Sequence, residues 1–527
     1  MRTRRRLAAA LALVACAATA CGGGSGRRSA HADPPVVAAT GECAQLAAVP
    51  NGSGRQLRGM WIATVANLDW PASPGESAAT EQAQYERLLD TAVAMRLNAV
   101  FVQVRPAGDA FYPSAYEPWS KYLTGTPGKN PGYDVLKFLI DEAHKRNLEF
   151  HAWFNPYRAG MDTDRNALAA SSPARQHPSW AVKYGSQLWY DPGQPQVRQL
   201  AETVVLDVLN RYDVDGIHFD DYFYPYPEGG DFPDSASYKA YGGGLSKAAW
   251  RRRNVDTLVQ DLSARIHRAK PWVKFGISPF GVWRNSSTDP AGSATTALQS
   301  YDDIYADTRG WVTKGWLDYV APQLYWPLGD ARAGYATLVA WWAKQVAGTK
   351  VQLWIGQGAY RVGEDATWKK PAELSRQLSL DARYRQVTGE VFFSAGDLRR
   401  NKYGFAARIR ADHFTRPALP PVLGGGSAPA APTAVRTAAG GKSVKVTWTG
   451  AASGAVEYAI YRSAGRTPGC APVGSAALLA TVRSTGTSMG LVDPAVRPGA
   501  TYTYYVTALD RTHRESRPGR GSTLVAH

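Results

Sequence analysis

The chain has 527 residues, of which 44% are hydrophobic and 20% charged, so it is a globular protein too long for one ordinary domain. Its formal net charge of +16 is concentrated at the two ends: residues 1–30 contain six arginines and no acid, and residues 433–527 contain eleven basic and four acidic residues. A nucleic-acid-binding protein needs a basic face on its main domain, so the nearly neutral centre argues against nucleic acid as a partner.

The N-terminus predicts export. Four arginines within residues 2–6 precede a short apolar run over 7–20, which is too short to span a bilayer. The segment Ala18-Thr-Ala-Cys21 resembles a bacterial lipoprotein cleavage site, so we expect a signal peptide over 1–21 and a lipid on Cys21. Cys16 as the lipidated residue and ordinary secretion are the alternatives. The pairing of Cys43 with Cys470 stays open.

Residues 22–54 are rich in Gly, Ala, Pro and Ser and predict a flexible tether. Strand patterns then alternate with helical stripes, and the helix before the fourth strand is expected to begin at Pro195. The predicted strands cover 58–63, 98–105, 149–155, 216–221, 274–279, 319–325, 351–356 and 390–394. Such βα repetition predicts an α/β fold, a (β/α)8 TIM-type barrel over 55–416. An open doubly wound sheet is the alternative, but no glycine-rich phosphate loop follows an early strand.

The C-terminal part predicts a second, small domain. Residues 417–432 have the Pro, Gly and Ala content of a linker. Residues 433–527 contain short alternating strands and predict an all-β, immunoglobulin-like sandwich that resembles a fibronectin type III domain. Trp448 would be its core tryptophan, and Tyr502 matches the position of a tyrosine corner.

The doublet Asp220-Asp221 is the strongest chemical signal in the chain. In strand alternation His218 and Asp220 point to one side and Ile217 and Phe219 to the other, while Asp221 lies past the strand's end, at the rim. A carboxylate pair at the C-terminal end of a barrel strand, followed by aromatic residues, is typical of barrels that cleave sugars. The alternative is that the acids cap the next helix or bind a structural cation.

If the barrel closes, polar and aromatic residues at the ends of the other strands share this face. Amide, imidazole and aromatic groups in such a lining suit a neutral polyhydroxylated ligand, although each residue alone could be structural, the two histidines above all. The predicted substrate-binding residues are Arg105, His151, Trp153, Asn155, Tyr157, His218, Tyr222, Trp283, Gln323, Tyr325, Trp326 and Gln357.

Six motifs, in order over roughly residues 55–415, resemble the glycosyl-hydrolase-like family 10. They are Arg58-Gly-Met-Trp-Ile-Ala, Asn155-Pro-Tyr-Arg, Asp191-Pro-Gly, Asp215-Gly-Ile-His-Phe-Asp-Asp-Tyr, Ile277-Ser-Pro-Phe-Gly and Ala321-Pro-Gln-Leu-Tyr-Trp-Pro. The resemblance implies a glycoside-hydrolase barrel. A characterised family member is an envelope lipoprotein that cuts peptidoglycan glycan strands lacking stem peptides.

Cleavage of a glycoside needs an acid for the leaving oxygen and a second group at the sugar carbon. Asp220 is the first candidate and Asp221 the second. The doublet resembles the paired acids of chitinases, but Tyr222 stands where their glutamate would be, so Asp397 or Asp109 is a candidate partner.

We therefore expect an exported, monomeric glycoside hydrolase that acts on a cell-wall polysaccharide, above all peptide-free peptidoglycan strands, without cofactor or metal. A glucan hydrolase and a non-catalytic glycan-binding lipoprotein are the alternatives. The expected location is the cell membrane facing the wall, or outside the cell.

Overall fold

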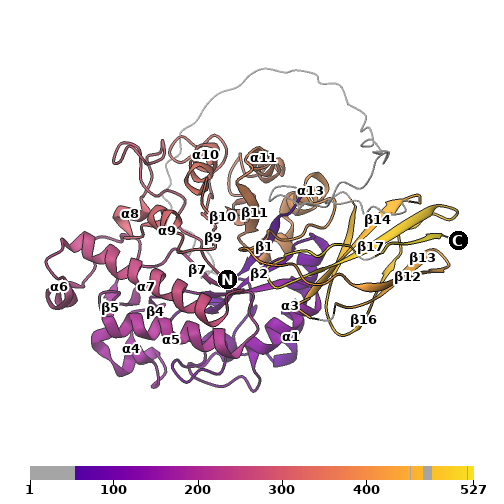
Figure 1. Cartoon of the computed structure of the whole chain (residues 1–527). Coiled ribbons are helices and arrows are strands. Elements are labelled where there is room, and N and C mark those ends of the chain that lie inside the picture. Colours follow the sequence, from indigo (N-terminus) through magenta and orange to yellow (C-terminus); the bar gives the residue numbers. More distant parts are fainter. Residues whose placement is uncertain (1–53, 452, 467–476, 519, 527) are drawn as a thin grey trace. The chain divides into compact units, whose positions relative to one another are not determined.

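The computed structural model describes residues 54–451, 453–466, 477–518 and 520–526, shown in Figure 1. The predicted signal peptide and the four cysteines, Cys16, Cys21, Cys43 and Cys470, lie outside these ranges. In the described part, eight strands close into a barrel in the order β1-β11-β10-β9-β8-β7-β3-β2, and each neighbouring pair is parallel. This closure confirms the predicted TIM-type barrel.

The barrel strands are short and mostly lie where the sequence places them. Their bounds are β1 Leu57–Ile62, β2 Ala99–Arg105, β3 Glu149–Phe154, β7 Gly216–Phe219, β8 Lys274–Ile277, β9 Tyr319–Val320, β10 Gln352–Gln357 and β11 Val387–Phe392. The strand predicted over 319–325 is present but shorter: β9 covers only Tyr319–Val320, and Pro322 has no N–H to donate to a ladder. Pairing continues only as isolated bridges from Gln323 to Phe280 and to Gly356.

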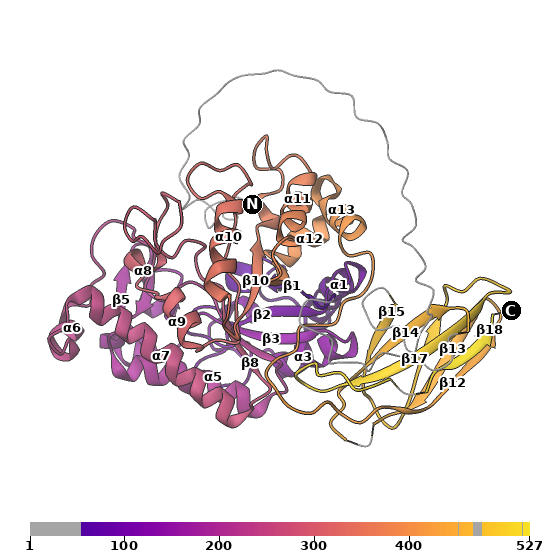
Figure 2. The same ribbon diagram turned by 45° about the horizontal axis from the view of Figure 1, so that its top comes forward.

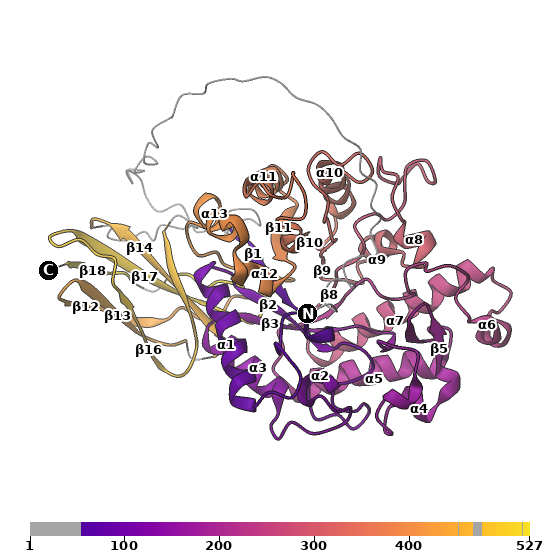
Figure 3. The ribbon, with the colours of Figure 1, turned by 180° about the vertical axis from the view of Figure 1, so that it is seen from behind.

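Helices follow the strands on the outside of the barrel; Figure 2 and Figure 3 show α1, α3, α5 and α7 flanking it. The helix α5 begins at Pro195 as predicted, because a first-turn proline lacks only an N–H that would have no helical partner. The longer helices are α1 Ala78–Ala94, α3 Val135–Lys145, α5 Pro195–Arg211, α7 Lys247–Ala269, α10 Tyr335–Val346, α11 Ala372–Asp381 and α13 Phe405–Asp412. The shorter ones are α2 Lys121–Thr124, α4 Pro173–Gln176, α6 Ser235–Tyr241, α8 Ser300–Asp303, α9 Thr308–Lys314 and α12 Ala395–Arg400.

A three-stranded antiparallel sheet is inserted between β3 and α5, and the sequence patterns did not predict it. Its order is β4-β6-β5, with bounds β4 Arg158–Gly160, β5 Ala181–Tyr184 and β6 Gln187–Tyr190. The insertion follows the C-terminal end of β3, which is the end where barrel enzymes bind their substrates.

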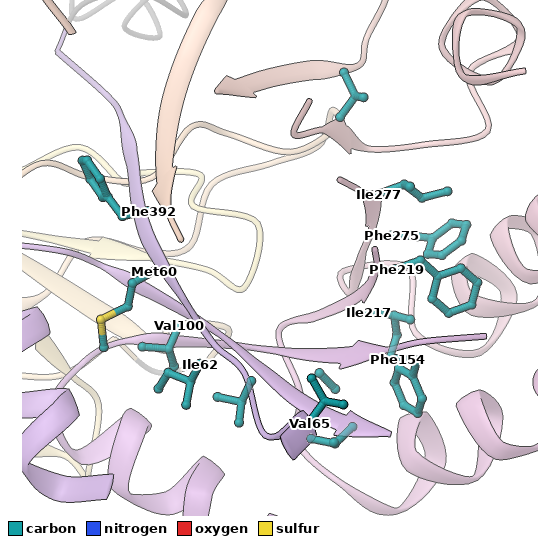
Figure 4. Close-up of a cluster of buried hydrophobic side chains, with 14 of the residues drawn as sticks. Met60, Ile62, Val65, Val100, Phe154, Ile217, Phe219, Phe275, Ile277 and Phe392 are labelled. Carbon is teal, nitrogen blue, oxygen red and sulfur yellow. The ribbon is translucent and has the colours of Figure 1, made fainter. Parts of the chain in front are cut away.

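The two faces of the barrel strands carry different side chains. Ile217 and Phe219 of β7 belong to the large hydrophobic cluster between the strands and the surrounding helices. Figure 4 shows them beside outward-facing residues of neighbouring strands. The inner face holds a separate, largely aromatic cluster that includes Trp61, Phe101 and Trp354. The predicted alternation of β7 is therefore confirmed.

Two glycines make room for the rings inside the barrel. A Cβ on Gly216 would lie 2.2 Å from Nδ1 of His151, and a Cβ on Gly276 would lie 2.2 Å from Cζ of Tyr319. Both distances are far shorter than a van der Waals contact, so the imidazole and phenol rings occupy the space that side chains at these positions would need.

The C-terminal part is a small all-β domain of two antiparallel sheets, as predicted. One sheet has the order β12-β13-β16 and the other β15-β14-β17-β18. Trp448 is buried in its core, and the Tyr502 hydroxyl accepts the backbone N–H of Arg497 at 3.1 Å, as a tyrosine corner requires. The strand bounds are β12 Thr433–Gly440, β13 Ser443–Thr449, β14 Glu457–Ala464, β15 Leu478–Arg483, β16 Ser488–Asp493, β17 Thr501–Leu509 and β18 Ser522–Val525.

Among the residues with described coordinates, no helix is both long enough and apolar enough to cross a membrane.

Candidate active site

Asp220 is the first residue after β7 and is 3% exposed. Its Oδ2 accepts the indole N–H of Trp153 at 3.0 Å and the amide N–H of Asn155 at 3.1 Å, both from β3 and its end. Its Oδ1 accepts the backbone N–H of Tyr222 at 3.2 Å. Two donors on one oxygen and one on the other fix the carboxyl group and leave Oδ1 as the oxygen that can carry a proton.

Burial, and then the neighbouring charge of Asp221, raise the pKa of Asp220 to about 7. The hydrogen bonds from Trp153 and Tyr222 favour the ionised form but do not overcome these two effects. Asp220 can therefore hold a proton near neutral pH, as a general acid must.

Asp221 lies past the end of β7, and at 4% exposed it is as buried as Asp220. Its Oδ1 accepts an amide N–H of Gln323 at 3.0 Å, and its Oδ2 accepts the hydroxyl of Tyr226. Burial raises the pKa of Asp221. Gln323 also donates to the backbone carbonyl of Ser278, so this amide links the doublet to the ends of the next two strands.

An arc of aromatic rings passes the doublet. Tyr222 lies 6.0 Å from Trp189 and 5.6 Å from Tyr226, measured between ring centroids. Tyr226 lies 5.9 Å from Phe280, which lies 5.4 Å from Trp326. Only Tyr222 and Trp326 were predicted site residues; the others come from loops and from the inserted sheet, whose positions depend on the closed barrel. Such rings are suited to stacking against sugar faces.

Both predicted histidines lie inside the barrel beneath the doublet. The indole N–H of Trp61 donates to Nε2 of His218 at 3.0 Å, which leaves the proton of His218 on Nδ1, facing the Tyr319 hydroxyl at 3.0 Å. That hydroxyl then donates to Nδ1 of His151 at 3.1 Å, and Nε2 of His151 donates to Glu149 at 3.1 Å. Burial lowers the pKa of both imidazoles. Their nitrogens are therefore engaged within the protein.

Arg105 is also engaged by the protein itself. Its guanidinium forms a bidentate ion pair with Glu117, with Nε 2.7 Å from Oε2 and Nη2 2.5 Å from Oε1. Both side chains are at most 1% exposed. A sequence pattern gives no sign of this partner, because Glu117 lies in the loop that follows β2.

Tyr157 and Trp283 are buried away from the doublet's hydrogen-bond network. Tyr157 is fully buried, and its hydroxyl finds no hydrogen-bond partner among the described residues. Trp283 stacks on Trp341 at 6.1 Å, and its indole N–H donates to Asp307 at 3.0 Å.

Tyr325 lies in the loop after β9, and Gln357 is the last residue of β10. Tyr325 is half-buried between Tyr360 and Phe393, at centroid distances of 5.5 and 6.1 Å. Burial, then Tyr360 and then the Asp221 charge raise the pKa of Tyr325. Gln357 is buried and donates to Glu390 at 3.0 Å, so its amide is used inside the barrel wall.

The candidate partner acids have partners of their own. Asp397, in α12 after β11, lies 2.5 Å from Arg400 and accepts the Ser394 hydroxyl at 3.1 Å. The strand β11 stands opposite β7 in the ring of eight, four strands away in either direction. Asp109 accepts the backbone N–H of Ala107 at 3.0 Å, and burial raises its pKa to about 6.

Asp69 is a further buried acid on this side of the barrel that the sequence analysis did not identify. It accepts N–H groups of Ala63 and Gly396 and the Ser394 hydroxyl, at 2.6 to 3.0 Å. Burial raises its pKa to about 6. These bonds tie the end of β1 to the start of α12.

No group of three or more His, Cys, Asp or Glu side chains is arranged to hold a metal ion within the described ranges.

Comparison with known proteins assigns the family. Residues 56–372 match the family described as Glycosyl hydrolase-like 10. The chain belongs to this family. The family relative YngK of Bacillus subtilis (strain 168), named a glycosyl hydrolase, is 45% identical over 485 residues, which cover 89% of this chain and 94% of the relative. The glycosyl hydrolase DigH of Escherichia coli (strain K12) is 42% identical over 365 residues, covering 65% of this chain and 83% of DigH.

Solved structures similar to this chain include the PgaB (BpsB) glycoside hydrolase domain from Bordetella bronchiseptica. It matches this chain with a TM-score of 0.44 at 14% sequence identity, and the match covers 68% of this chain and 98% of that domain. The barrel assignment rests on the closed strand order rather than on this likeness. Membership of the glycosyl-hydrolase-like family 10 supports a glycoside-hydrolase type of function for the barrel.

Proposed function

We propose that this protein is an exported glycoside hydrolase that cleaves O-glycosidic bonds in peptide-free glycan strands of peptidoglycan. The observation that carries the enzymatic part is Asp220, a buried carboxyl group at the C-terminal end of a barrel strand whose pKa is raised to about 7. The wall substrate is proposed from the lipoprotein-like N-terminus and the family resemblance of the sequence motifs.

In the proposed reaction Asp220 donates its proton to the leaving glycosidic oxygen as the bond to the sugar carbon breaks. Asp221, held by Gln323 and Tyr226, orients and polarises the acetamido group of the substrate. The acetamido oxygen attacks the sugar carbon, so no second protein nucleophile is needed. Water then opens the cyclic intermediate and returns a proton to Asp220. This route fits amino sugars, and it accommodates the absence of a glutamate after Asp221.

The test measures release of reducing ends from purified, peptide-stripped glycan strands. Asp220→Asn keeps the size of the side chain but cannot donate the carboxylic proton, so we expect turnover to fall at least 100-fold, in line with the usual contribution of a general acid. Unchanged turnover would exclude Asp220 as the acid. A panel with glucans in place of amino-sugar strands separates the proposed substrate from the glucan alternative.

Asp397→Asn tests the remaining sequence prediction. If Asp397 is the second acid, this variant loses as much turnover as Asp220→Asn, and the substrate-assisted route is then replaced by a two-carboxylate mechanism.

A glycan-binding role without cleavage is the second candidate. It is favoured by the hydrogen bonds inside the protein that occupy both carboxylates of the doublet. In that case wild-type protein releases no product from any polysaccharide, while binding to glycan strands is the same in wild type and in Asp220→Asn.

A further inference from the structure

Arg158 is a buried cation beside the doublet that the proposed reaction does not use. It begins β4, directly after the C-terminal end of β3, and is 4% exposed. Its backbone N–H donates to Oδ1 of Asn155 at 2.8 Å, and the amide nitrogen of the same Asn155 donates to Asp220 at 3.1 Å. One asparagine thus fixes the position of Arg158 relative to the candidate acid.

The guanidinium of Arg158 lies against aromatic rings. Its Cζ is 4.3 Å from the ring centroid of Tyr222 and 5.4 Å from that of Trp189, both members of the aromatic arc. A planar guanidinium that stacks on a ring keeps its N–H groups in the plane, where they can meet a planar acceptor.

Among the described residues the guanidinium has only neutral hydrogen-bond partners. Nε donates to Gln187 at 3.2 Å and Nη1 to the Pro106 carbonyl at 3.4 Å, and the guanidinium also donates to the Tyr222 hydroxyl. Among the described residues no carboxylate lies within the 4.0 Å ion-pair distance of Arg158. Arg105, equally buried, binds Glu117 by two short hydrogen bonds. Asp220 and Asp221 interact with this charge from beyond 4.0 Å, so a ligand carboxylate would supply the directly contacting counter-ion that the buried guanidinium lacks.

The charge of Arg158 also reaches the doublet. Its positive field lowers the pKa of both Asp220 and Asp221, although burial raises both by more. A group bound to Arg158 would therefore lie close to the bond on which Asp220 acts.

We propose that Arg158 binds a carboxylate carried by the sugar next to the cleaved bond, an inference that rests on the proposed glycosidase function. The planar fork of an arginine matches a carboxylate through two parallel hydrogen bonds, which are stronger than neutral ones. Arg158 would then determine specificity by selecting sugars that carry a negative charge at this position.

In peptide-free peptidoglycan this carboxylate is the lactyl group of the muramic acid residue. Attachment of a stem peptide converts the carboxylate into an amide, which removes the charge and adds bulk. Recognition by Arg158 therefore gives a physical reason for a preference for stripped strands. Uronic acid residues in other wall or capsule polymers carry the same chemical group, and the experiment distinguishes the two sources.

The experiment compares kcat/KM on peptide-free strands with kcat/KM on the same strands after their carboxyl groups are reduced to alcohols. A charge-assisted hydrogen bond to a buried partner predicts a wild-type ratio of about 10 to 100 in favour of the carboxylate form. In Arg158→Gln this ratio falls to about 1. Arg158→Lys keeps the charge but loses the fork, so its ratio is intermediate.

The ratio is the readout, because loss of Arg158 also changes the pKa values of the doublet and hence the turnover of every substrate. A purely structural role would lower both rates equally and leave the ratio unchanged. Arg361→Gln is the matched control: Arg361 also lies over a ring, Trp368 at 5.6 Å, but it has its own carboxylate, Glu364 at 2.9 Å. We expect this variant to keep the wild-type ratio.

A wild-type ratio near 1 overturns the inference without any variant, and so does an unchanged ratio in Arg158→Gln. If carboxylate-bearing and reduced strands are cleaved at equal rates, the role proposed for Arg158 is wrong but the proposed glycosidase function is unaffected. A third outcome is that a uronate-containing polymer is cleaved and amino-sugar strands are not. If Arg158→Gln then loses the preference for the uronate carboxylate, the proposed substrate is wrong but the proposed recognition of a carboxylate by Arg158 is confirmed.

Discussion

Replacement of Asp220 by asparagine should change the pH dependence of folding as well as catalysis. The folded protein raises the pKa of Asp220 from 3.8 to about 7, so between these values folded Asp220 keeps a proton that the unfolded chain has lost. The unfolded state then binds fewer protons than the folded state, and the free energy of unfolding falls as the pH rises. Asparagine cannot ionise, so the stability of the variant does not fall with rising pH through this residue.

The magnitude follows from the size of the pKa shift. A shift of roughly 3 units at about 1.36 kcal/mol per unit makes wild type about 4 kcal/mol less stable above pH 7 than below pH 4 through this group. The carboxamide can accept the N–H groups of Trp153 and Asn155, but its NH2 faces the backbone N–H of Tyr222. That mismatch costs about 1–3 kcal/mol at every pH. We expect Asp220→Asn to be less stable than wild type at pH 4 and more stable at pH 8.

The assay is urea denaturation of both proteins at several pH values, with Asp141→Asn as control. Asp141 is an exposed helical residue paired with Lys137 at 2.7 Å, so its removal should change stability by less than about 0.5 kcal/mol at any pH. A difference between Asp220→Asn and wild type that is constant from pH 4 to 8 would refute the reasoning, because it would mean that folding does not raise this pKa.

Asp221→Asn removes the neighbouring charge, which is the second cause of the raised pKa of Asp220. The pKa of Asp220 should therefore be lower in this variant, and the fall in stability with rising pH should be smaller. Carbon-13 NMR titration of the carboxyl groups measures this shift directly, and an unchanged pKa of Asp220 would show that burial acts alone.

Three further variants test the scaffold. Glu117→Gln leaves Arg105 without its counter-ion and should destabilise the barrel by about 3–5 kcal/mol in urea unfolding; a change below about 1 kcal/mol would contradict the buried ion pair. Gly276→Ala should destabilise by about 1–3 kcal/mol or more, since its Cβ would lie 2.2 Å from the Tyr319 ring, and an unchanged melting temperature argues against that contact. Trp448→Ala should destabilise the C-terminal sandwich by about 3–5 kcal/mol, read from faster amide exchange in its strands.

The barrel itself was predictable from local patterns. Alternation within one strand placed Ile217 and Phe219 toward the helices and His218 toward the interior, because successive side chains of a strand point to opposite faces. The strand predicted over 319–325 ends before Pro322, and the sheet β4-β6-β5 was missed because it is an antiparallel insertion outside the βα repetition on which the strand predictions rested.

The partners of the site residues could not be predicted in the same way. Asp221 meets Gln323 from a strand end 102 residues further along the chain, and Asp220 meets Trp153 across 67 residues. These contacts depend on strand register and on closure of the barrel, neither of which is encoded in a local pattern.

The sequence by itself determined the βα repetition, the position of the Asp220-Asp221 doublet at the end of one strand, and the family motifs, because each is a short-range feature of the chain. Only the tertiary structure decided that burial and a neighbouring charge raise the pKa of Asp220 and that Arg105 is bound by Glu117. It also decided that the charge of Arg158 reaches the doublet while no carboxylate of the described residues lies within 4.0 Å of it. These properties arise from desolvation and charge placement, which exist only once distant segments pack together.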